Sequence, residues 1–217
     1  MTGTDRRLVL ATRNPAKVVE LREILAEALA GTGLELVGLD AFAGLEDVVE
    51  SGVTFADNAL LKARYAARAT GLPALADDSG LAVDVLGGAP GVFSARWAGP
   101  LAEAAGTSRD EANNALLLAQ LADVPDEHRG AGFVCAAALV VPGEGPGSVG
   151  REVVREGHCR GALARSPRGD GGFGYDPLLL RPDGRTLAEH SAAEKNAVSH
   201  RGQAFRALSE DLQTLQP

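Results

Sequence analysis

The stretch Leu72-Pro73-Ala74-Leu75-Ala76-Asp77-Asp78-Ser79-Gly80 places two adjacent carboxylates directly after an apolar run. Residues 73–77 have the composition of a buried strand, and Asp-Ser-Gly is typical of a turn, so we expect the strand to end at Asp77. The apolar run 81–86 is then a separate segment. Mg²⁺ is commonly bound by one or two carboxylates together with substrate phosphates, so this pair is a candidate metal site. Taken alone, the four residues favour a plain polar turn.

Around this stretch, apolar runs alternate with helical patterns. Short strands are predicted at 7–11, 34–39 and 177–180, and two long strands at 131–141 and 151–163, joined by the Gly/Pro-rich segment 142–150. Helices are predicted at 15–30, 55–70 and 109–121, and two further helical pieces follow the caps Ser191 and Ser199. The acidic stretch 46–52 and the glycine-rich stretch 169–174 are predicted loops. The pattern indicates an α/β protein of mixed α+β type.

Length and charge limit the classes of function. At 217 residues, without an internal repeat, the chain is expected to form a single domain over residues 1–217. Its net charge of −8 disfavours nonspecific binding to nucleic acid or to an anionic membrane surface. The polar N-terminus and the lack of a long apolar run favour a cytoplasmic location. Cys135 and Cys159 lack the paired spacing of a zinc site and are expected to be ordinary small core residues.

Cations stand at three predicted helix starts. Lys17 lies three residues after Asn14, Lys195 follows Ser191 closely, and His200-Arg201 come directly after Ser199. A helix N-terminus carries partial positive charge, which disfavours a cation there and favours an anion. Three such placements suggest that each helix start and its cation together receive a polyanion such as phosphate. The alternative is three solvated side chains that point away from any ligand.

Two further features carry possible chemistry. Asn58 and Lys62 share one face of the predicted helix 55–70, although Lys62 alone could be an ordinary surface lysine. The segment 171–177 combines glycines with Phe173, Tyr175 and Asp176. Glycines allow the backbone to approach a ligand closely, and an aromatic face can stack on a planar base. A packing corner at a strand entry would have a similar composition.

Several common site motifs are absent from the sequence. The chain has no Gly-x-x-x-x-Gly-Lys-Ser/Thr loop, no Gly-x-Gly-x-x-Gly after the first predicted strand and no Gly-x-Ser-x-Gly. A P-loop enzyme, a dinucleotide-binding protein and an α/β-hydrolase nucleophile are therefore not indicated.

Six blocks of sequence, taken in order, resemble the noncanonical purine NTP pyrophosphatases, also called the inosine triphosphatase or HAM1-like family. The blocks are Thr12-Arg13-Asn14-Pro15-Ala16-Lys17, Thr54-Phe55-Ala56-Asp57-Asn58-Ala59 with Lys62-Ala63, Ala76-Asp77-Asp78-Ser79-Gly80-Leu81, Gly88-Ala89-Pro90-Gly91 with Ser94-Ala95-Arg96, Phe173-Gly174-Tyr175-Asp176-Pro177, and Glu194-Lys195 with Ser199-His200-Arg201-Gly202. Together they cover nearly the whole chain, and their order makes the resemblance far more specific than any one block.

The resemblance implies a Mg²⁺-dependent homodimer that hydrolyses ITP, dITP and XTP to the monophosphate and pyrophosphate. It also implies an elongated central mixed sheet flanked by helices, in two lobes with an active-site cleft between them. The family's catalytic base and metal ligand correspond to Asp78. Its substrate-binding residues correspond to Thr12, Arg13, Asn14, Pro15, Ala16, Lys17, Ser79, Phe173, Gly174, Tyr175, Asp176, Lys195, His200 and Arg201, and Lys62 is added as a phosphate-neutralising lysine.

Some assignments stay open at this point. The second metal carboxylate is expected from the acidic stretch, where Glu46, Asp47 and Glu50 compete and Glu50 is chosen. The attacking water could be positioned by Asp78 or by Asp77. Selectivity is expected from donors such as Arg201 and backbone N–H groups, which would accept the oxygen at position 6 of hypoxanthine or xanthine and reject the amine of adenine.

Two other functions compete with this one. The first is a related pyrophosphatase that acts on modified pyrimidines or methylated nucleotides, as Maf-like proteins do. The second is a noncatalytic nucleotide sensor. The acidic pair argues against a sensor, because the binding of a triphosphate alone does not require carboxylates beside the anion.

Overall fold

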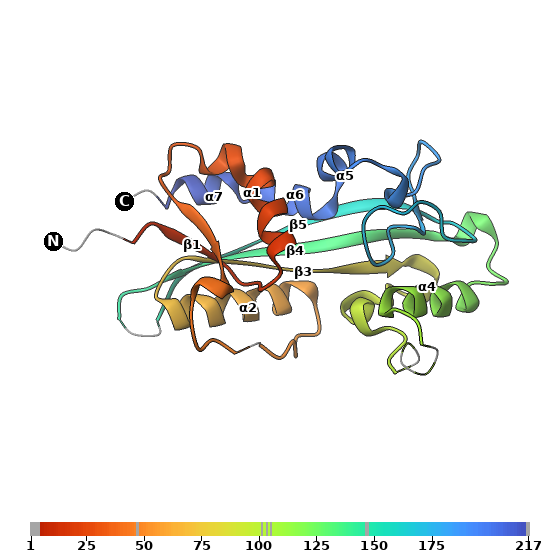
Figure 1. The fold of residues 1–217 in the computed structure, drawn as a ribbon, viewed down its shortest axis with the longest axis horizontal. Helices are drawn as coiled ribbons and strands as arrows, with labels where there is room; N and C mark the ends of the chain where they lie inside the picture. Colours follow the sequence, from red (N-terminus) through yellow and green to blue (C-terminus); the bar gives the residue numbers. More distant parts are fainter. Residues whose placement is uncertain are drawn as a thin grey trace. The chain divides into compact units, whose positions relative to one another are not determined.

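A computed structural model describes residues 5–46, 48–100, 102, 104, 106–145 and 148–215, with Ala16 described by its backbone alone. The six strands form one sheet in the order β2-β1-β3-β4-β5-β6 (Figure 1). Their bounds are β1 Arg7–Leu10, β2 Glu35–Gly38, β3 Ala74–Val83, β4 Gly130–Pro142, β5 Val149–Leu163 and β6 Leu179–Leu180. Strand β1 pairs in parallel with β2 and β3, and β5 pairs antiparallel with β6. The predicted mixed α/β class is confirmed.

The helices have the bounds α1 Pro15–Leu29, α2 Phe55–Thr70, α4 Arg109–Gln120, α5 Ala192–Val198, α6 His200–Arg206 and α7 Ser209–Gln213. Apart from α7, these helices begin where the capping residues predict. Thr54, Ser108 and Ser191 each close a capping box, in which the hydroxyl accepts from the third backbone N–H and the acid there accepts from the cap N–H. The last predicted helical piece is two helices, α6 and α7, in the structure.

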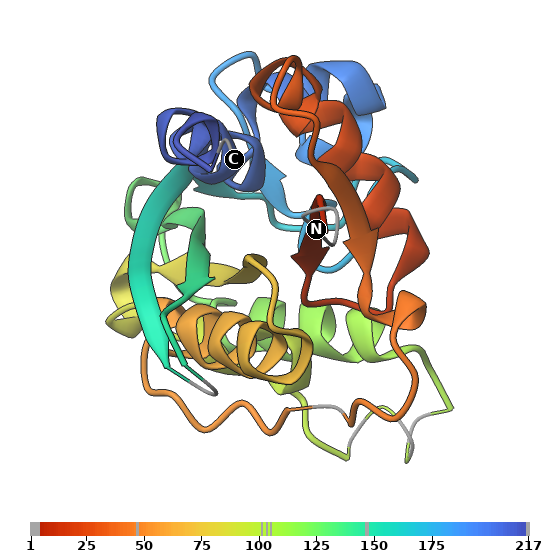
Figure 2. The same cartoon turned by 90° about the vertical axis from the view of Figure 1, so that its left-hand side faces the viewer.

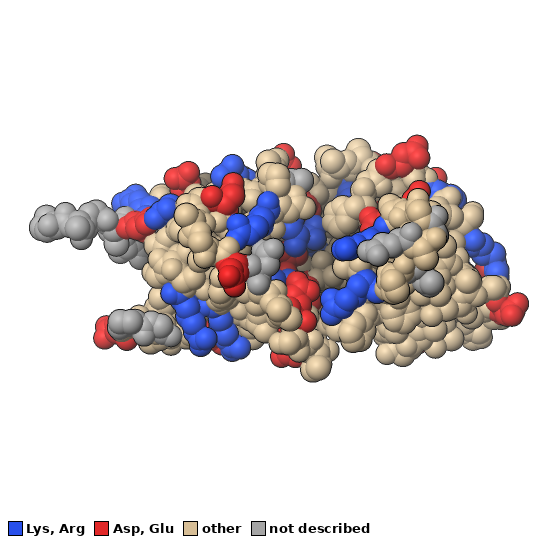
Figure 3. Space-filling model, turned by 60° about the horizontal axis from the view of Figure 1, so that its bottom comes forward, with Lys and Arg blue, Asp and Glu red and all other residues tan. Residues whose placement is uncertain are grey.

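The chain divides into two compact units, each with its own core. The first contains residues 1–78, 135–157 and 201–217, and the second contains residues 79–134 and 158–200. No helix among the described residues is long and apolar enough to cross a membrane. On the face drawn in Figure 3, Lys and Arg side chains are interspersed with Asp and Glu side chains.

Strand alternation builds the core of the first unit in two layers. Leu8 and Leu10 of β1 and Leu75 of β3 pack in one cluster with side chains of α1, α6 and α7. Val9 of β1 and Ala74 of β3 pack in the other cluster with side chains of α2. Figure 2 shows α1 and α7 on one side of the strands and α2 on the other. This arrangement follows from the two-residue period of a strand, which directs successive side chains to opposite faces.

The prediction of a turn at Asp-Ser-Gly is wrong, because β3 runs without interruption from Ala74 to Val83. It neighbours the 13-residue strand β4, and pairing with a long partner can outweigh the local turn preference of Asp, Ser and Gly. Gly80 fits this strand for a steric reason. A Cβ there would lie 2.6 Å from the carbonyl oxygen of Gly91, which is closer than real Cβ contacts allow. Asp77 and Asp78 are therefore neighbours in the middle of a strand and project to opposite faces.

The second unit packs around the far end of β3 and around α4. Its core includes Leu81 and Val83 of β3, Leu117 and Leu121 of the α4 region, and Tyr175. Arg129 is also buried there, and its guanidinium donates to the carbonyl oxygens of Leu121, Leu163 and Ala164 at 2.7 to 3.0 Å. A buried charged group must be hydrogen-bonded or paired. Here three backbone carbonyls, rather than a carboxylate, meet that requirement for Arg129.

Candidate active site

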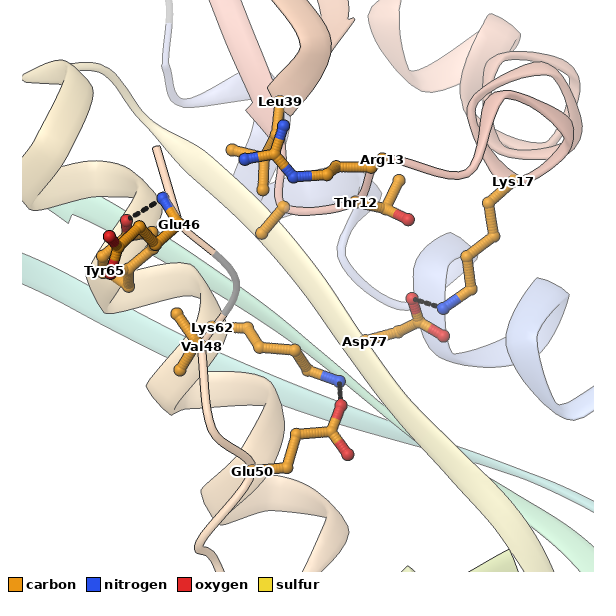
Figure 4. A pocket seen from close by; sticks show the side chains of 11 residues that line it. Thr12, Arg13, Lys17, Leu39, Glu46, Val48, Glu50, Lys62, Tyr65 and Asp77 are labelled. Atoms are coloured by element: carbon orange, nitrogen blue, oxygen red, sulfur yellow. Dashed lines mark hydrogen bonds and ion pairs between the residues drawn. The ribbon is translucent and has the colours of Figure 1, made fainter. Parts of the chain in front are cut away.

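A cavity of about 240 Å³ opens in the first unit beside Asp77. It is lined by β3, by the segments after β1 and β2, by the first turn of α1, by the acidic stretch and by α2. The lining residues are Ala11, Thr12, Arg13, Lys17, Leu39, Glu46, Val48, Glu50, Lys62, Tyr65 and Asp77 (Figure 4). Asp47 lies outside the described residues. Three of the side chains lining this small cavity are cations, Arg13, Lys17 and Lys62, and three are acids, Glu46, Glu50 and Asp77. The cavity therefore offers both signs of charge, as a phosphate bound together with a metal ion requires.

Asp77 is held from both sides by cations. The Lys17 ammonium lies 2.7 Å from its Oδ1, and the Arg201 Nε lies 3.2 Å from its Oδ2. The guanidinium of Arg201 also reaches the carboxylate of Glu20 at 3.2 Å. Burial alone would raise the pKa of Asp77, but Lys17 and Arg201 outweigh it and hold this pKa well below its usual range. Asp77 is thus a fixed anion whose two oxygens are both engaged.

Asp78, on the opposite face of β3, is held by α2. Its Oδ2 accepts from the Asn58 amide at 3.1 Å, and its Oδ1 accepts from the Lys62 ammonium at 3.2 Å. Burial raises the pKa of Asp78, and Lys62 and Asn58 offset this only in part. The two neighbouring carboxyls are therefore shifted in opposite directions, a pattern found where an acid and a base have distinct roles.

Lys62 connects Asp78 to the acidic stretch. Its ammonium lies 3.0 Å from Glu50 Oε1 (Figure 4). The same ammonium lies 3.2 Å from Asp78 Oδ1, so one group holds Glu50 and Asp78 together. Burial lowers the pKa of Lys62, but Asp78 and Asp77 reverse this effect, so the net pKa is raised and the ammonium stays charged. Glu46 instead donates its backbone N–H to the Tyr65 hydroxyl at 2.8 Å. Of the two competing acids that the structure describes, Glu50 is the one joined to Asp78.

The donor set fits a magnesium ion. No cluster of three or more His, Cys, Asp or Glu side chains with metal-binding geometry occurs among the described residues. Glu50 and Asp78 nevertheless supply two hard oxygen ligands that already share one positive charge. Two carboxylates suffice for Mg²⁺ when substrate phosphates and water complete its six ligands.

The loop after β1 forms the N-terminal cap of α1. The Asn14 N–H donates to Thr12 Oγ1 at 3.2 Å, and Asn14 Oδ1 accepts from the Lys17 N–H at 3.4 Å. Pro15 is the first residue of α1, and Ala16 follows it with its side chain undescribed. The Arg13 guanidinium donates to the Leu45 carbonyl. The structure therefore brings Thr12, Arg13 and Lys17 to the cavity and leaves Asn14 and Pro15 exposed beside it.

In the second unit, the glycine-rich segment presents an exposed aromatic ring. Phe173 is 59% exposed, and the Lys195 ammonium lies 4.7 Å from its ring centroid. The same ammonium is 2.6 Å from Asp176 Oδ2, which also accepts from the Phe173 N–H at 2.9 Å. Tyr175 is buried, and its hydroxyl donates to the Ser94 carbonyl at 2.9 Å.

Helix α4 holds Gly174 from both sides. The Gly174 N–H donates to Asp110 Oδ2 at 2.6 Å, and its carbonyl accepts from the Asn114 amide at 3.0 Å. Gly174 has φ +60, a conformation that disfavours side chains. His200, at the other end of the second unit's sequence, is buried and stacks on Phe133 with ring centroids 4.8 Å apart. Ser79 is half-buried.

The cations at the predicted helix starts have partners that the sequence did not indicate. Lys17 and Arg201 both bind Asp77, and Lys195 binds Asp176. Both aspartates are buried. These three cations are therefore paired with carboxylates of the protein itself, and a bound phosphate would meet positive charge that is already partly neutralised.

The model of the Ham1 family matches residues 8–211. The chain belongs to the Ham1 family. A protein named dITP/XTP pyrophosphatase from Streptomyces coelicolor is 60% identical over 204 residues, which cover 93% of this chain and 94% of that protein. One of the same name from Mycobacterium tuberculosis is 53% identical over 210 residues, 96% of each chain.

Solved structures of Ham1 proteins share the fold. The Staphylococcus aureus Ham1 protein matches with a TM-score of 0.81 at 34% identity and covers 96% of this chain and 98% of its own. A nucleoside-triphosphatase, dITP/XTP pyrophosphatase, from Mycobacterium abscessus matches with a TM-score of 0.72 at 50% identity, covering 93% and 98%.

The sequence did not indicate four contacts of the candidate site residues. Glu20 completes the ion pairs of Arg201, Asp110 and Asn114 hold Gly174, and Asn58 contacts Asp78. The helical spacing of Asn58 and Lys62 was the one available signal, because it places both on one face. The contact of that face with Asp78 depends on which side of β3 the Asp78 carboxylate occupies. The sequence analysis expected a turn at Asp78, so it could not assign the carboxylate to one side of a strand.

Proposed function

We propose that this Ham1 protein hydrolyses dITP, XTP and ITP to the nucleoside monophosphate and pyrophosphate. Its membership in the Ham1 family, and the shared name of relatives that cover nearly the whole chain, support this activity. The single structural observation that carries it is the arrangement of Asp78, Lys62 and Glu50 beside a small cavity that Arg13 and Lys17 also line. A triphosphate needs both positive charge and a group that activates water, and both are present here.

We assign the activation of water to Asp78. Asp77 is compensated by two cations, Lys17 and Arg201, and its pKa is lowered, so it is a poor proton acceptor. Asp78 contacts one cation, Lys62, and the neutral amide of Asn58. The raised pKa of Asp78 makes it the better base, because proton transfer is favoured as the pKa of the base approaches the working pH. Asp78 orients a water for attack on the α-phosphorus and takes its proton, and pyrophosphate leaves.

Cations neutralise the charge that develops on the phosphoryl oxygens. Lys17 and Lys62 supply two ammonium groups, and Asp77 keeps Lys17 in place. Glu50 and Asp78 would hold Mg²⁺, which when bound supplies Lewis-acid stabilisation of the phosphates. Arg201 is buried, with Asp77 and Glu20 as partners, so we propose that it acts through Asp77.

We propose that the segment Phe173 to Asp176 and Lys195 bind the purine. Phe173 offers an exposed face for stacking, and backbone N–H groups can donate to the 6-oxygen of hypoxanthine or xanthine. Adenine presents an amine at that position and would leave such donors unpaired. His200 and Ser79 remain proposed substrate-side residues. A cytoplasmic homodimer completes the proposal, on the basis of the family resemblance and of nucleotides as substrates.

One assay tests the activity. The purified protein is incubated with Mg²⁺ and a panel of ITP, dITP, XTP, ATP, GTP and modified pyrimidine triphosphates, and the products are resolved as monophosphate plus pyrophosphate or diphosphate plus phosphate. Preferential release of pyrophosphate from ITP, dITP and XTP supports the proposal. Preference for modified pyrimidines would favour a Maf-like activity, and binding without turnover would favour a sensor.

The Asp78→Asn variant tests the assignment of the base. Loss of a positioned general base costs about 10²- to 10⁴-fold in rate, so kcat is expected to fall in this range while the fold remains. Asp40→Asn, on an exposed residue, serves as the matched control and is expected to retain kcat. A near-native rate for Asp78→Asn with Mg²⁺ would refute the assignment.

A further inference from the structure

Asn58 is completely buried and uses both ends of its amide. Its Oδ1 accepts from the Gly52 N–H at 2.8 Å, and its Nδ2 donates to Asp78 Oδ2 at 3.1 Å. A flipped amide would place an oxygen against the Asp78 carboxylate and an amine against the Gly52 N–H, so the orientation is fixed by its partners. One carboxamide thus serves as acceptor for the acidic stretch and as donor to Asp78.

Two parallel bridges join the acidic stretch to Asp78. Lys62 connects Glu50 to Asp78 Oδ1 by charge, and Asn58 connects Gly52 to Asp78 Oδ2 by neutral hydrogen bonds. Asn58 and Lys62 are four residues apart on α2, so one helix face carries both bridges. The acidic stretch fits closely against this face, because a Cβ on Gly52 would lie 2.6 Å from Asn58 Oδ1.

The two bridges differ in what a bound cation would do to them. A divalent cation held by Glu50 and Asp78 competes with the Lys62 ammonium for the same oxygens, since Lys62 contacts Glu50 Oε1 and Asp78 Oδ1. The Asn58 bridge uses Asp78 Oδ2 and a backbone N–H, so it can persist when Lys62 gives up these contacts.

We propose that Asn58 is a positioning residue that sets the rotation of the Asp78 carboxylate and its separation from the Glu50 segment, so that Asp78 Oδ1 and Glu50 stay available to a divalent cation. The inference rests on the proposed function, because it assigns Glu50 and Asp78 to the cation. Asn58 contacts neither substrate nor cation in this arrangement and acts through Asp78 and Gly52.

The test compares Asn58→Ala, Asn58→Asp and the matched control Asp57→Ala. Asp57 precedes Asn58 on α2 and closes the capping box with Thr54, so its loss weakens the same helix without removing the bridge. Asn58→Asp keeps an acceptor for the Gly52 N–H but removes the donor to Asp78. It also preserves the volume of the side chain, which keeps the test usable if the Ala variant fails to fold.

Two readouts separate positioning from stability. Mn²⁺ binding to the nucleotide-free protein is followed by electron paramagnetic resonance, and kcat and KM are measured at saturating Mg²⁺. Asn58→Ala is expected to weaken Mn²⁺ binding at least fivefold, and both Asn58 variants are expected to lower kcat at least tenfold. Asp57→Ala is expected to lower Tm by about 2–4 °C and to leave both quantities within twofold.

The measured Mn²⁺ affinity and kcat decide whether Asn58 has a positioning role. If Asn58→Ala lowers Tm as Asp57→Ala does while Mn²⁺ affinity and kcat stay within twofold of wild type, Asn58 is only structural and the inference fails. A near-native kcat for Asn58→Asp also overturns it. If the wild-type protein releases no pyrophosphate, the proposed function fails instead, and the Mn²⁺ comparison between wild type and Asn58→Ala still decides the positioning role.

Discussion

At the scale of single residues, β3 places two identical side chains in contrasting environments. Asp77 is compensated by Lys17 and Arg201, whereas Asp78 keeps a raised pKa because burial is only partly offset. The sequence allowed both aspartates to be named as candidates. It could not separate them, because their difference depends on which layer of helices each one faces.

The opposite pKa shifts of Asp77 and Asp78 predict that Asp77→Asn and Asp78→Asn affect the free energy of unfolding differently. Asp77→Asn removes the carboxylate that Lys17 shares with the buried Arg201 and leaves Arg201 with the Glu20 carboxylate, so it is expected to destabilise the protein by about 3–5 kcal/mol. Asp78→Asn removes a carboxylate whose charged form is disfavoured by burial and is expected to be neutral or stabilising, as at other sites that trade stability for function. Urea unfolding of both variants at pH 7 measures the difference, and equal losses would contradict it.

The stabilisation from Asp77 should also depend on pH. Because the folded-state pKa of Asp77 is lowered, its contribution is fully present above the unfolded pKa of about 4 and is lost as pH falls through the folded pKa. The stability gap between wild type and Asp77→Asn is therefore expected to be constant from pH 7 to pH 5 and to close below pH 4. Unfolding curves at stepped pH test this, with Asp40→Asn as the control; a gap that persists unchanged to pH 2 would be inconsistent with it.

At the scale of elements, local signals predicted the helices better than the central strand. The starts of α2, α4 and α5 follow from Thr54, Ser108 and Ser191, because a capping box is formed by residues three apart in sequence. The course of β3 through Asp77 to Gly80 depends on a partner strand more than 45 residues away in the sequence. A local pattern contains no information about that pairing. The prediction therefore followed the turn preference of Asp, Ser and Gly and ended the strand at Asp77.

The continuity of β3 gives a prediction for Gly80. Its φ is not positive, so Gly80→Ala carries no backbone penalty of the left-handed kind, but its Cβ would approach the Gly91 carbonyl at 2.6 Å. We expect a loss of about 1–3 kcal/mol or more from overpacking. Gly31→Ala is the comparison, because Gly31 has φ +80 and open space, and its cost is conformational, about 1–2 kcal/mol. Thermal unfolding measures both, and a Gly80→Ala variant as stable as wild type would contradict the close packing.

The hold of α4 on Gly174 predicts a change in selectivity. Asp110→Ala removes the acceptor of the Gly174 N–H and is expected to reduce the preference for XTP over ATP in kcat/KM, while Asp110→Asn keeps an acceptor and rescues it. Glu111→Gln weakens the capping box of the same helix without touching Gly174, and so controls for stability. Equal selectivity in Asp110→Ala and wild type would show that the position of Gly174 does not affect recognition of the base.

At the scale of the whole molecule, the resemblance to a family was the most informative part of the sequence. Its six blocks lie in segments that the fold distributes over both compact units, and each unit receives several of them. Within the first unit, Lys17, Lys62 and Arg201 come from three different helices and converge on the Asp77-Asp78 pair. Their order along the chain could be recognised from the sequence, whereas their carboxylate partners required the packing of helices on both faces of the sheet.

The last prediction concerns how ligands stabilise the whole protein. Two carboxylates hold Mg²⁺ weakly by themselves, and a nucleotide alone brings its negative charge to Glu50 and Asp78 in a chain of net charge −8. We therefore expect Mg²⁺ alone, or a nonhydrolysable α,β-imido analogue of dITP alone, to raise Tm only slightly. Together, at about 100 times the dissociation constant, they add about 2.7 kcal/mol and so raise Tm by roughly 5–10 °C. Differential scanning fluorimetry measures this, and the joint effect should be lost in Asp78→Asn; a full shift with the nucleotide and EDTA would show that these carboxylates do not hold the cation.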